Sequence, residues 1–198
     1  MKLTSASSLQ EVAVAVGAHL ASRGIRAVLT GGACVAIHTA TYVSKDADFV
    51  LQGRVAQRDL EEALGELGFV RQGPEYVHPE VPFTVEFPLG PLSIGDDLSI
   101  VPVELSVGKS ATLGLSATDS CRDRLAAFYH WNDRQALALA VEIARARPVD
   151  FDRIRDWSAR EGKTAEFSEF LRKTGKRPQR IQRGTSAGTR PTGLRRRR

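Results

Sequence analysis

The segment Val28–Leu51, VLTGGACVAIHTATYVSKDADFVL, constrains the fold more than any other part of the sequence. A short apolar run is followed by Gly31 and Gly32, then by a mostly apolar segment, 33–40, and then by Asp46-Ala47-Asp48 and further apolar residues. This order predicts a strand, a glycine turn, a helix and a second strand. Because glycine has no Cβ, such a turn lets a phosphate-bearing ligand approach the backbone, and the first amides of the helix favour anions.

The second strand of this segment carries a pair of carboxylates. Side chains alternate along a strand, so Asp46 and Asp48 share one face while Ala47 and Phe49 share the other. Two carboxylates this close repel each other unless a cation lies between them. Mg²⁺ fits that role because it takes oxygen ligands and accepts phosphate oxygens, and Mn²⁺ is an alternative. Each motif alone is common, as an ordinary turn or a solvated strand end, but their order makes the combination more specific.

Gly31-Gly32 followed by Asp46-Ala47-Asp48 resembles the signature of the DNA-polymerase-β-like nucleotidyltransferase superfamily. The sequence is most similar there to small bacterial members, including abortive-infection and toxin–antitoxin nucleotidyltransferases. The resemblance covers Val28–Leu51 well and Phe83–Arg147 loosely. It implies that an NTP donates a nucleoside monophosphate to an acceptor hydroxyl, with metal held by the carboxylates. The implied acceptors are RNA, especially a tRNA 3′ end, or a protein hydroxyl, and a cognate antitoxin is an implied partner.

A third carboxylate is expected if two metal ions clamp the attacking and leaving oxygens. Glu86 is the first choice, because it faces away from the apolar side of a predicted core strand. It occupies the place where the superfamily usually carries an aspartate, so the sequence departs from the pattern here. Glu104, on the next strand, is the rival, and a solvent-facing glutamate is the alternative reading for both.

Further nucleotide-binding residues are expected around this pair. Gly31 and Gly32 would form the phosphate turn, and Ser44 lies two residues before Asp46, on the same face of a regular strand. The toxin-like relatives carry a Lys or Arg on a later helix that touches the triphosphate, and Arg124 is the matching candidate here. Strand polarity explains Ser44 equally well, and a surface ion-pair network is the simpler reading of any single helical arginine.

Several classes of function are disfavoured by what the sequence lacks. No Gly-Lys-Ser/Thr follows Gly31-Gly32, which argues against a P-loop ATPase, and no Gly-x-Gly-x-x-Gly indicates a Rossmann dehydrogenase. Cys34 and Cys121 lie in apolar surroundings and predict buried structural thiols, which is consistent with a reducing cytoplasm. There is no secretory signal and no apolar run long enough for a membrane span, so no membrane partner is expected. His130 beside Trp131 indicates packing.

The remaining pattern predicts an α+β fold with a C-terminal helical part. The resemblance implies that its sheet is a nucleotidyltransferase-like mixed sheet with flanking helices. Helical spacing of apolar residues occurs first in Leu9–Ser22 and Arg54–Leu67. Period-two patterns predict strands at Phe69-Val70, Tyr76-Val77, Phe83–Phe87 and Val101–Leu105. Helical patterns return at Asp119–Trp131, Asp133–Arg147, Asp152–Arg160 and Thr164–Leu171. The expected divisions are a core at 1–112, a helical part at 113–171 and a disordered basic tail at 172–198.

The charge of the chain is concentrated in that tail. Residues 172–198 hold 11 Lys and Arg and no acidic residue, although the whole chain has a net charge of only +5. The rest of the chain is therefore acidic, and the tail cannot bury enough apolar surface to fold. Two other classes of function stay open beside the enzyme. One is a catalytically inactive nucleotide-binding module, and the other is an RNA- or protein-binding adaptor that acts through the tail.

Overall fold

The computed structural model describes residues 3–42 and 44–175. The sequence predicts a disordered tail at 172–198, and the residues of this tail from Lys176 onward lie outside the described part. The helices are α1 (Leu9–Ser22), α2 (Gly31–Thr39), α3 (Gln57–Glu66), α4 (Ala117–Trp131), α5 (Arg134–Ala146), α6 (Phe151–Arg160) and α7 (Thr164–Thr174). The strands are β1 (Ala27–Leu29), β2 (Asp46–Leu51), β3 (Val70–Gln72), β4 (Glu75–Val77), β5 (Thr84–Glu86), β6 (Val103–Val107) and β7 (Ser110–Gly114).

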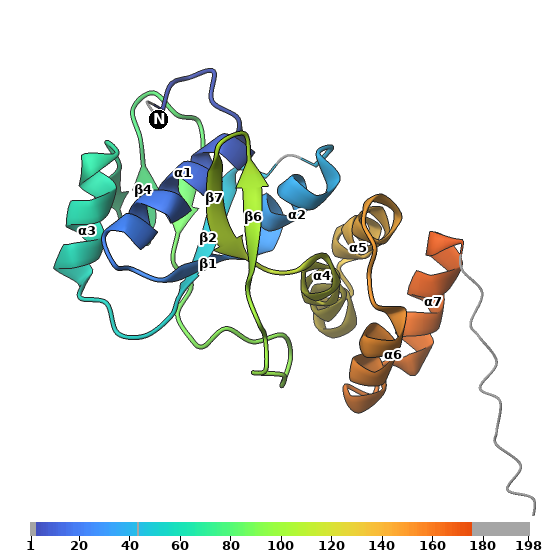
Figure 1. Cartoon of the computed structure of the whole chain (residues 1–198). Helices are drawn as coiled ribbons and strands as arrows, with labels where there is room; N and C mark the ends of the chain where they lie inside the picture. Colours follow the sequence, from blue (N-terminus) through green and yellow to red (C-terminus); the bar gives the residue numbers. More distant parts are fainter. Residues whose placement is uncertain (1–2, 43, 176–198) are drawn as a thin grey trace, which may run out of the picture.

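All seven strands form one mixed sheet in the order β3-β4-β5-β2-β1-β7-β6. The strand β2 pairs in parallel with β5 and antiparallel with β1, and β1 pairs in parallel with β7. Helix α1 runs across one face of the sheet, and α4 to α7 gather at one side of it (Figure 1). The predicted α+β architecture, with a mixed sheet, flanking helices and a C-terminal helical part, is confirmed.

The β1–α2–β2 unit lies at the centre of the sheet and matches the strand, turn, helix and strand expected of Val28–Leu51. Ala47 and Phe49 are fully buried, whereas Asp46 and Asp48 are half-buried. A Cβ added at Gly17 of α1 would lie 3.3 Å from the Phe49 ring. Phe49 therefore faces α1, and strand alternation places Asp46 and Asp48 on the opposite face of the sheet.

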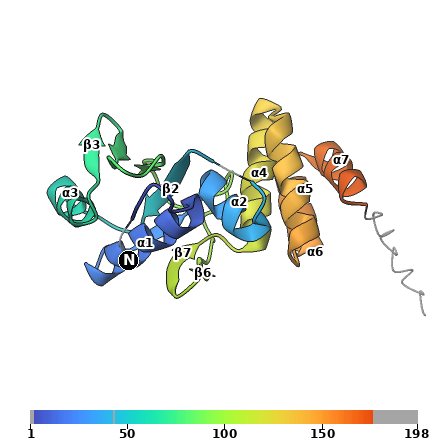
Figure 2. The same ribbon diagram turned by 90° about the horizontal axis from the view of Figure 1, so that it is seen from above.

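The C-terminal helices pack against one another and against α2. Helix α4 contacts α5 and α6, α7 contacts α5 and α6, and α2 contacts both α4 and α5. Seen from above, α2 lies between the sheet and these helices (Figure 2). The interior of the helical part is filled by large apolar side chains, among them Leu125, Leu137, Ile143, Trp157 and Phe170. The helical part therefore packs against α2, the helix that leads into the strand carrying the two aspartates.

Two strands at the edge of the sheet differ from the sequence prediction. The strand predicted at Val101–Leu105 lies instead at Val103–Val107, because Pro102 has no amide to donate to a ladder. Its hairpin partner β7, Ser110–Gly114, was not predicted. The expected core boundary at 112 falls inside β7, which ends at Gly114.

Helix α7 also continues further than the apolar pattern indicated. It extends through Thr174 and ends at Gly175, whose φ of 80° is left-handed. Arg172 and Lys173 lie in its last turn, where positive charge favours the helix dipole. Residues 172–174, expected in the tail, are therefore helical. None of the helices in residues 3–42 and 44–175 is both long enough and apolar enough to cross a membrane.

Candidate functional site

The three carboxylates predicted from the sequence lie on one face of two neighbouring strands. In the parallel pairing of β2 with β5, Asp46 lies opposite Thr84 and Asp48 lies opposite Glu86. Residues paired across adjacent strands point to the same face, so Glu86 shares the face of Asp46 and Asp48. We call this set of Asp46, Asp48 and Glu86 the carboxylate face. All three side chains are half-buried.

The electrostatics of the carboxylate face disfavour ionisation of its central member. Burial, followed by the negative charges of Asp46 and Glu86, raises the pKa of Asp48 from 3.8 to about 6. Burial, followed by the charges of Glu75 and Asp46, also raises the pKa of Glu86. A half-buried carboxylate whose pKa is raised by burial and by neighbouring negative charges lies where a cation would be stabilised.

Gly31 and Gly32 are required by close approaches of side chains from the second strand. Gly31 has a φ of 58°, and a Cβ at this position would collide with the Asp48 carboxylate. A Cβ at Gly32 would lie 2.7 Å from the Cβ of Ser44. The missing Cβ atoms thus leave room for the side chains of Asp48 and Ser44, and the expected role of Gly31 and Gly32 toward a phosphate stays a prediction. The start of α2 lies directly beside the Asp48 carboxylate.

The first turn of α2 begins at a threonine whose side chain does not cap it. Thr30 caps the helix without a side-chain cap hydrogen bond, and its own amide donates to the Asp48 carbonyl oxygen at 2.9 Å. The first amides of an α-helix have no intrahelical acceptor, and the helix dipole makes this end positive. The structure therefore places an anion-favouring helix end next to a carboxylate pair.

Ser44 meets Asp46, as strand alternation predicted, although it precedes the first residue of β2. Its hydroxyl donates to Asp46 Oδ1 at 2.6 Å. This hydrogen bond orients the Asp46 carboxylate and occupies one of its lone pairs. The predicted role of Ser44 toward a nucleotide stays a prediction.

Arg124 supplies positive charge from α4. Its guanidinium donates to Asp123 through Nε at 3.1 Å and through Nη2 at 2.6 Å, and its side chain is 22% exposed. Burial works to lower the pKa of Arg124, but the charge of Asp123, the hydrogen bond to Asp123 and the charge of Asp48 outweigh burial and raise the pKa. Arg124 in turn works to lower the pKa of Asp48. The arginine chosen from the sequence thus interacts electrostatically with the carboxylate face.

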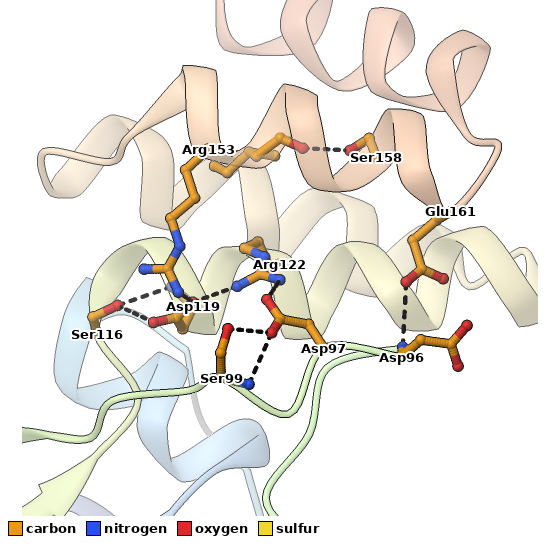
Figure 3. A network of polar contacts seen from close by, with 10 residues as sticks. Asp96, Asp97, Ser99, Ser116, Asp119, Arg122, Arg153, Ser158 and Glu161 are labelled. Carbon is orange, nitrogen blue, oxygen red and sulfur yellow. Dashed lines mark hydrogen bonds and ion pairs between the residues drawn. The ribbon is translucent and has the colours of Figure 1, made fainter.

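A buried ion network fixes the position of α4. Arg122 is 0% exposed, donates to Asp119 at 2.8 Å and pairs with Asp97 of the loop between β5 and β6 (Figure 3). Arg153 of α6 also pairs with Asp119, at 2.9 Å. The Arg122 guanidinium lies 5.0 Å from the centre of the Trp157 ring. The loop that carries Asp97, the helix α4 and the helix α6 are therefore joined by ion pairs around Arg122, two residues before Arg124.

The arrangement fits a metal ion held by two carboxylates better than a metal site built from three. Within the described ranges, no three His, Cys, Asp or Glu side chains are grouped as a metal site. Mg²⁺, however, is commonly bound by one or two carboxylates together with substrate phosphates. Asp46 and Asp48 meet that need on one face of β2, and Glu86 lies beside Asp48 by register. The negative charges of Asp46 and Glu86 beside the half-buried Asp48, which raise the pKa of Asp48, favour a cation here.

Glu104, the rival third carboxylate, lies far from this set. It is exposed on β6, the last strand of the sheet, and three strand spacings separate β6 from β2. At about 4.8 Å per spacing, this places Glu104 roughly 14 Å from β2. It lines a separate hollow of about 370 Å³ beside α1 and β7. The pairing of β2 with β5 decides between Glu86 and Glu104, and this pairing could not be predicted from the sequence.

The two cysteines are buried, as predicted. Desolvation raises the pKa of Cys34 to about 12 and that of Cys121 still further, so neither thiol is ionised at neutral pH.

Asp123 and Tyr42 were not predicted as part of the site. Asp123 binds Arg124, and its position next to Arg124 in the sequence was the available signal. A Cβ added at Gly32 would lie 3.2 Å from the Tyr42 ring. Nothing in the sequence around Tyr42 indicated that it lies at the site.

The sheet, its flanking helices and the β1–α2–β2 unit together define a nucleotidyltransferase-like fold. The chain is similar to the crystal structure of an antigenic nucleotidyltransferase-like protein from Paracoccidioides brasiliensis, with a TM-score of 0.55. Sequence identity is 17%, and the similarity covers 85% of this chain and 94% of that chain. At this identity the likeness shows the fold alone. No known protein family matches the sequence, and no curated protein matches it either.

Proposed function

We propose that this protein is a Mg²⁺-dependent nucleotidyltransferase that moves a nucleoside monophosphate from an NTP to an acceptor hydroxyl. The observation that carries the proposal is the arrangement around Asp48. This half-buried carboxylate shares a face with Asp46 and Glu86, lies at the start of α2 and interacts with the charge of Arg124. Carboxylates, a helix N-terminus and a cation at one place suit a metal-bound polyphosphate.

Each group has a distinct role in this proposal. Asp46 and Asp48 hold the metal, and the hydrogen bond from Ser44 orients Asp46. The first amides of α2 and the guanidinium of Arg124 bind phosphate oxygens and offset their negative charge. Glu86 flanks Asp48 from β5, and its raised pKa suits a group that accepts a proton from the acceptor hydroxyl. When bound, Mg²⁺ would lower the pKa of that hydroxyl and offset charge on the departing pyrophosphate.

The resemblance to toxin-like nucleotidyltransferases extends the proposal to the acceptor. RNA, especially a tRNA 3′ end, is the first acceptor to test, and a protein hydroxyl is the second. In this proposal the protein is the toxin of a toxin–antitoxin or phage-defence system, with a cognate antitoxin as its partner. The basic tail, 172–198, would raise the local concentration of an RNA acceptor through its phosphates.

A transfer assay with total RNA tests the site assignment. Labelled NTPs are incubated with Mg²⁺, total tRNA and either wild-type protein or the Asp46→Ala or Asp48→Ala variant. The expected loss is at least about 100-fold for each variant, because each removes a metal ligand. Glu86→Gln should also lose activity. Glu104→Gln is the matched control and should keep wild-type activity, since it neutralises a strand glutamate remote from the carboxylate face. Equal transfer by the Asp46 and Asp48 variants would remove the assignment.

A second candidate function is nucleotide binding without transfer. It is favoured by the lack, in the described residues, of a three-residue metal cluster and by glutamate in the place of the third aspartate. Calorimetric titration with each NTP and Mg²⁺ distinguishes the two functions. Binding that is lost in Asp48→Ala, with no transfer to RNA or protein under any condition tested, would favour the binding module.

A further inference from the structure

The strand β6 forms one edge of the sheet, and its outer side has no partner among the described residues. It is the last strand in the sheet order and pairs only with β7 there. Seen from above, β6 and β7 lie at the periphery of the molecule (Figure 2). A free edge offers backbone donors and acceptors to another strand, and proteins usually protect it with a lysine, a proline or a bulge. The segment Val103–Val107 contains no lysine or proline, and its unbroken register with β7 leaves no bulge.

The hairpin between β6 and β7 determines which backbone groups of β6 face outward. Gly108 and Lys109 form its two-residue loop, and the φ of 60° at Gly108 is the left-handed value that such a loop needs. The pair that closes the loop, Val107 with Ser110, exchanges hydrogen bonds, and such pairs alternate along an antiparallel ladder. Every second residue of β6, counted back from Val107, therefore bonds to β7.

The residues between them, Glu104 and Ser106, direct their amides and carbonyl oxygens off the free edge. The far side of β7 provides a check of this alternation. The Leu115 amide donates to the Leu29 carbonyl oxygen on β1 at 3.1 Å, so its neighbour Gly114 turns toward β6 instead. Glu104 and Ser106 are also exposed, so their side chains lie where those of an approaching strand can meet them.

We propose that two copies of this chain join through their β6 edges into one continuous sheet. The geometry fits an antiparallel pairing about a two-fold axis at Leu105. Glu104 then lies opposite Ser106 of the second copy, so the groups that point off the two edges bond each other. Val103, which is 37% exposed, lies opposite Val107 of the second copy, and each covers the other. Apolar side chains thus meet apolar ones, and no two like charges are directly opposed.

The neighbouring registers are less favourable. With the axis at Glu104, the two glutamates would oppose each other, and Ser106 would meet Pro102, which has no amide. With the axis at Ser106, only the last three of the five residues of β6 would pair with the other β6. The edge therefore complements itself in one register. A strand of another protein would need its own match to this sequence, whereas a second copy supplies that match.

The pairing places both carboxylate faces on one side of the joined sheet. Through the paired residues Leu113, Val28 and Val50, the side chain of Glu104 lies on the same face as Asp48. A two-fold axis perpendicular to the sheet keeps this face on the same side in both copies. At about 4.8 Å per spacing, seven spacings separate the two β2 strands by roughly 34 Å. Each copy therefore keeps its own site, and the inference does not depend on the proposed function.

Sedimentation equilibrium of the full chain, at several concentrations and physiological ionic strength, measures the dimer directly. The mass should rise with concentration from 21.6 kDa toward twice that value. Ser106→Lys places a cation opposite Glu104 and should lower the Kd of the dimer, whereas Ser106→Glu opposes like charges and should raise it. Each change should be about 2- to 30-fold, because every dimer contains two such cross-strand pairs. Both variants should keep the fold, since Ser106 is exposed.

Two further variants separate the register at β6 from a general effect of charge. Glu104→Lys combined with Ser106→Glu exchanges the two positions and again opposes unlike charges, so its Kd should match that of Ser106→Lys. Val70→Glu is the matched control for Ser106→Glu. It adds the same charge at an exposed position of β3, the opposite edge of the sheet, and should leave the Kd unchanged.

Three outcomes would overturn the inference. A mass of 21.6 kDa at every concentration would show that the edge does not join two copies. The same Kd for wild type, Ser106→Lys and Ser106→Glu would place the interface elsewhere. An equal rise in Kd for Val70→Glu and Ser106→Glu would show that net charge, and not the register at β6, controls association.

Discussion

Asp48 is held where its ionised form is disfavoured, by burial and then by the charges of Asp46 and Glu86. Its pKa rises from an ordinary value of 3.8 to about 6 in the folded protein. Well below pH 3.8, Asp48 is neutral in both the folded and the unfolded state, so its ionisation does not reduce the stability of the fold. As the pH rises from 3.8 to 6, the unfolded chain releases its proton first, so the folded state loses stability. Above pH 6 the loss is complete.

The first prediction is that Asp48→Asn stabilises the metal-free protein while it abolishes transfer. The gain at pH 7 should be on the order of 1–3 kcal/mol, since two units of pKa correspond to about 3 kcal/mol before screening is considered. Thermal unfolding at several pH values measures it, with a rise of roughly 2–4 °C in Tm per kcal/mol. The gain should disappear at pH 3.5. A gain that is the same at pH 3.5 and pH 7 would show that the cost of ionising Asp48 in the folded protein is not its cause.

The second prediction concerns the substitution of Gly31 at the start of α2. Gly31→Ala should lose transfer activity and more stability than the left-handed φ alone explains, because the new Cβ collides with the Asp48 carboxylate. Gly24→Ala is the matched control: its φ is 74° and no atom lies within 4 Å of the added Cβ. It should cost about 1–2 kcal/mol and keep full activity. Urea denaturation and the transfer assay report both quantities, and equal effects of the two variants would contradict the account.

At the scale of elements, the local signals in the sequence predicted the helices well. Helix α1 spans the residues of its apolar pattern, with a capping box of Ser8 and Glu11 at its start and Gly24, at a φ of 74°, just after its end. The strand Asp46–Leu51 follows from its alternation. The strand β7 was missed because Ser110–Gly114 has only a weak period-two pattern of apolar residues. Its pairing with β6 and β1 supplies the stabilisation that its own residues do not indicate.

The candidate site shows the same division between local and long-range information. Asp46 and Asp48 could be identified because two residues apart on one strand means one face. The choice between Glu86 and Glu104 could not be made from the sequence, because both alternate with apolar residues in the same way. Only the pairing of β5 with β2 places Glu86 beside Asp48. The 77% exposure of Trp131, which the sequence predicted to pack beside His130, was likewise hidden, since it depends on how α4 packs against α5 and α6.

The third prediction concerns the buried network that joins α4 to the loop after β5. Arg122→Met should destabilise the protein by about 3–5 kcal/mol, because it removes the ion pair of Asp97 and leaves the buried Asp119 with Arg153 as its remaining cationic partner. Arg155→Met is the control: Arg155 forms i,i+3 and adjacent ion pairs on the surface of α6 and should cost no more than about 1 kcal/mol. Denaturant unfolding measures both.

The pH dependence of that difference provides an internal check. Hydrogen bonds from Ser99, and then the Arg122 guanidinium, hold the pKa of Asp97 well below its usual range. A lowered pKa contributes stability above the unfolded value of 3.8, and this stability is lost as the pH falls toward the folded value. The difference between wild type and Arg122→Met should therefore narrow below pH 4. A difference that stays constant down to pH 2 would mean that poorer packing, and not the missing charge pairing, explains the variant.

At the scale of the whole molecule, an acidic folded part is joined to a basic tail. Residues 176–198 carry nine Lys and Arg, no acidic residue and no aromatic residue. Positive charge of this density binds phosphate backbones by releasing counterions, and without aromatic side chains it cannot add base stacking. The tail is therefore expected to bind nucleic acid weakly and without sequence preference.

The fourth prediction follows from that composition. A chain ending at Gly175, where α7 ends, should bind RNA more weakly than the full chain. Its plot of log K against log salt should also be flatter, by about 0.7 for each single-strand phosphate that the shorter chain no longer neutralises. Fluorescence anisotropy with a labelled oligoribonucleotide at several salt concentrations measures both quantities. The same affinity and slope for both chains would show that the tail has no part in RNA binding.

The central claim is that the carboxylate face transfers a nucleotide and not a terminal phosphate. One measurement tests it most directly: parallel reactions with total tRNA and Mg²⁺, in which the NTP is labelled at its α-phosphate or at its γ-phosphate. We predict that the acceptor gains label only from the α-phosphate, and that Asp46→Asn and Asp48→Asn abolish the gain. Transfer of γ-phosphate label, or α-phosphate transfer that persists in both variants, would contradict the account.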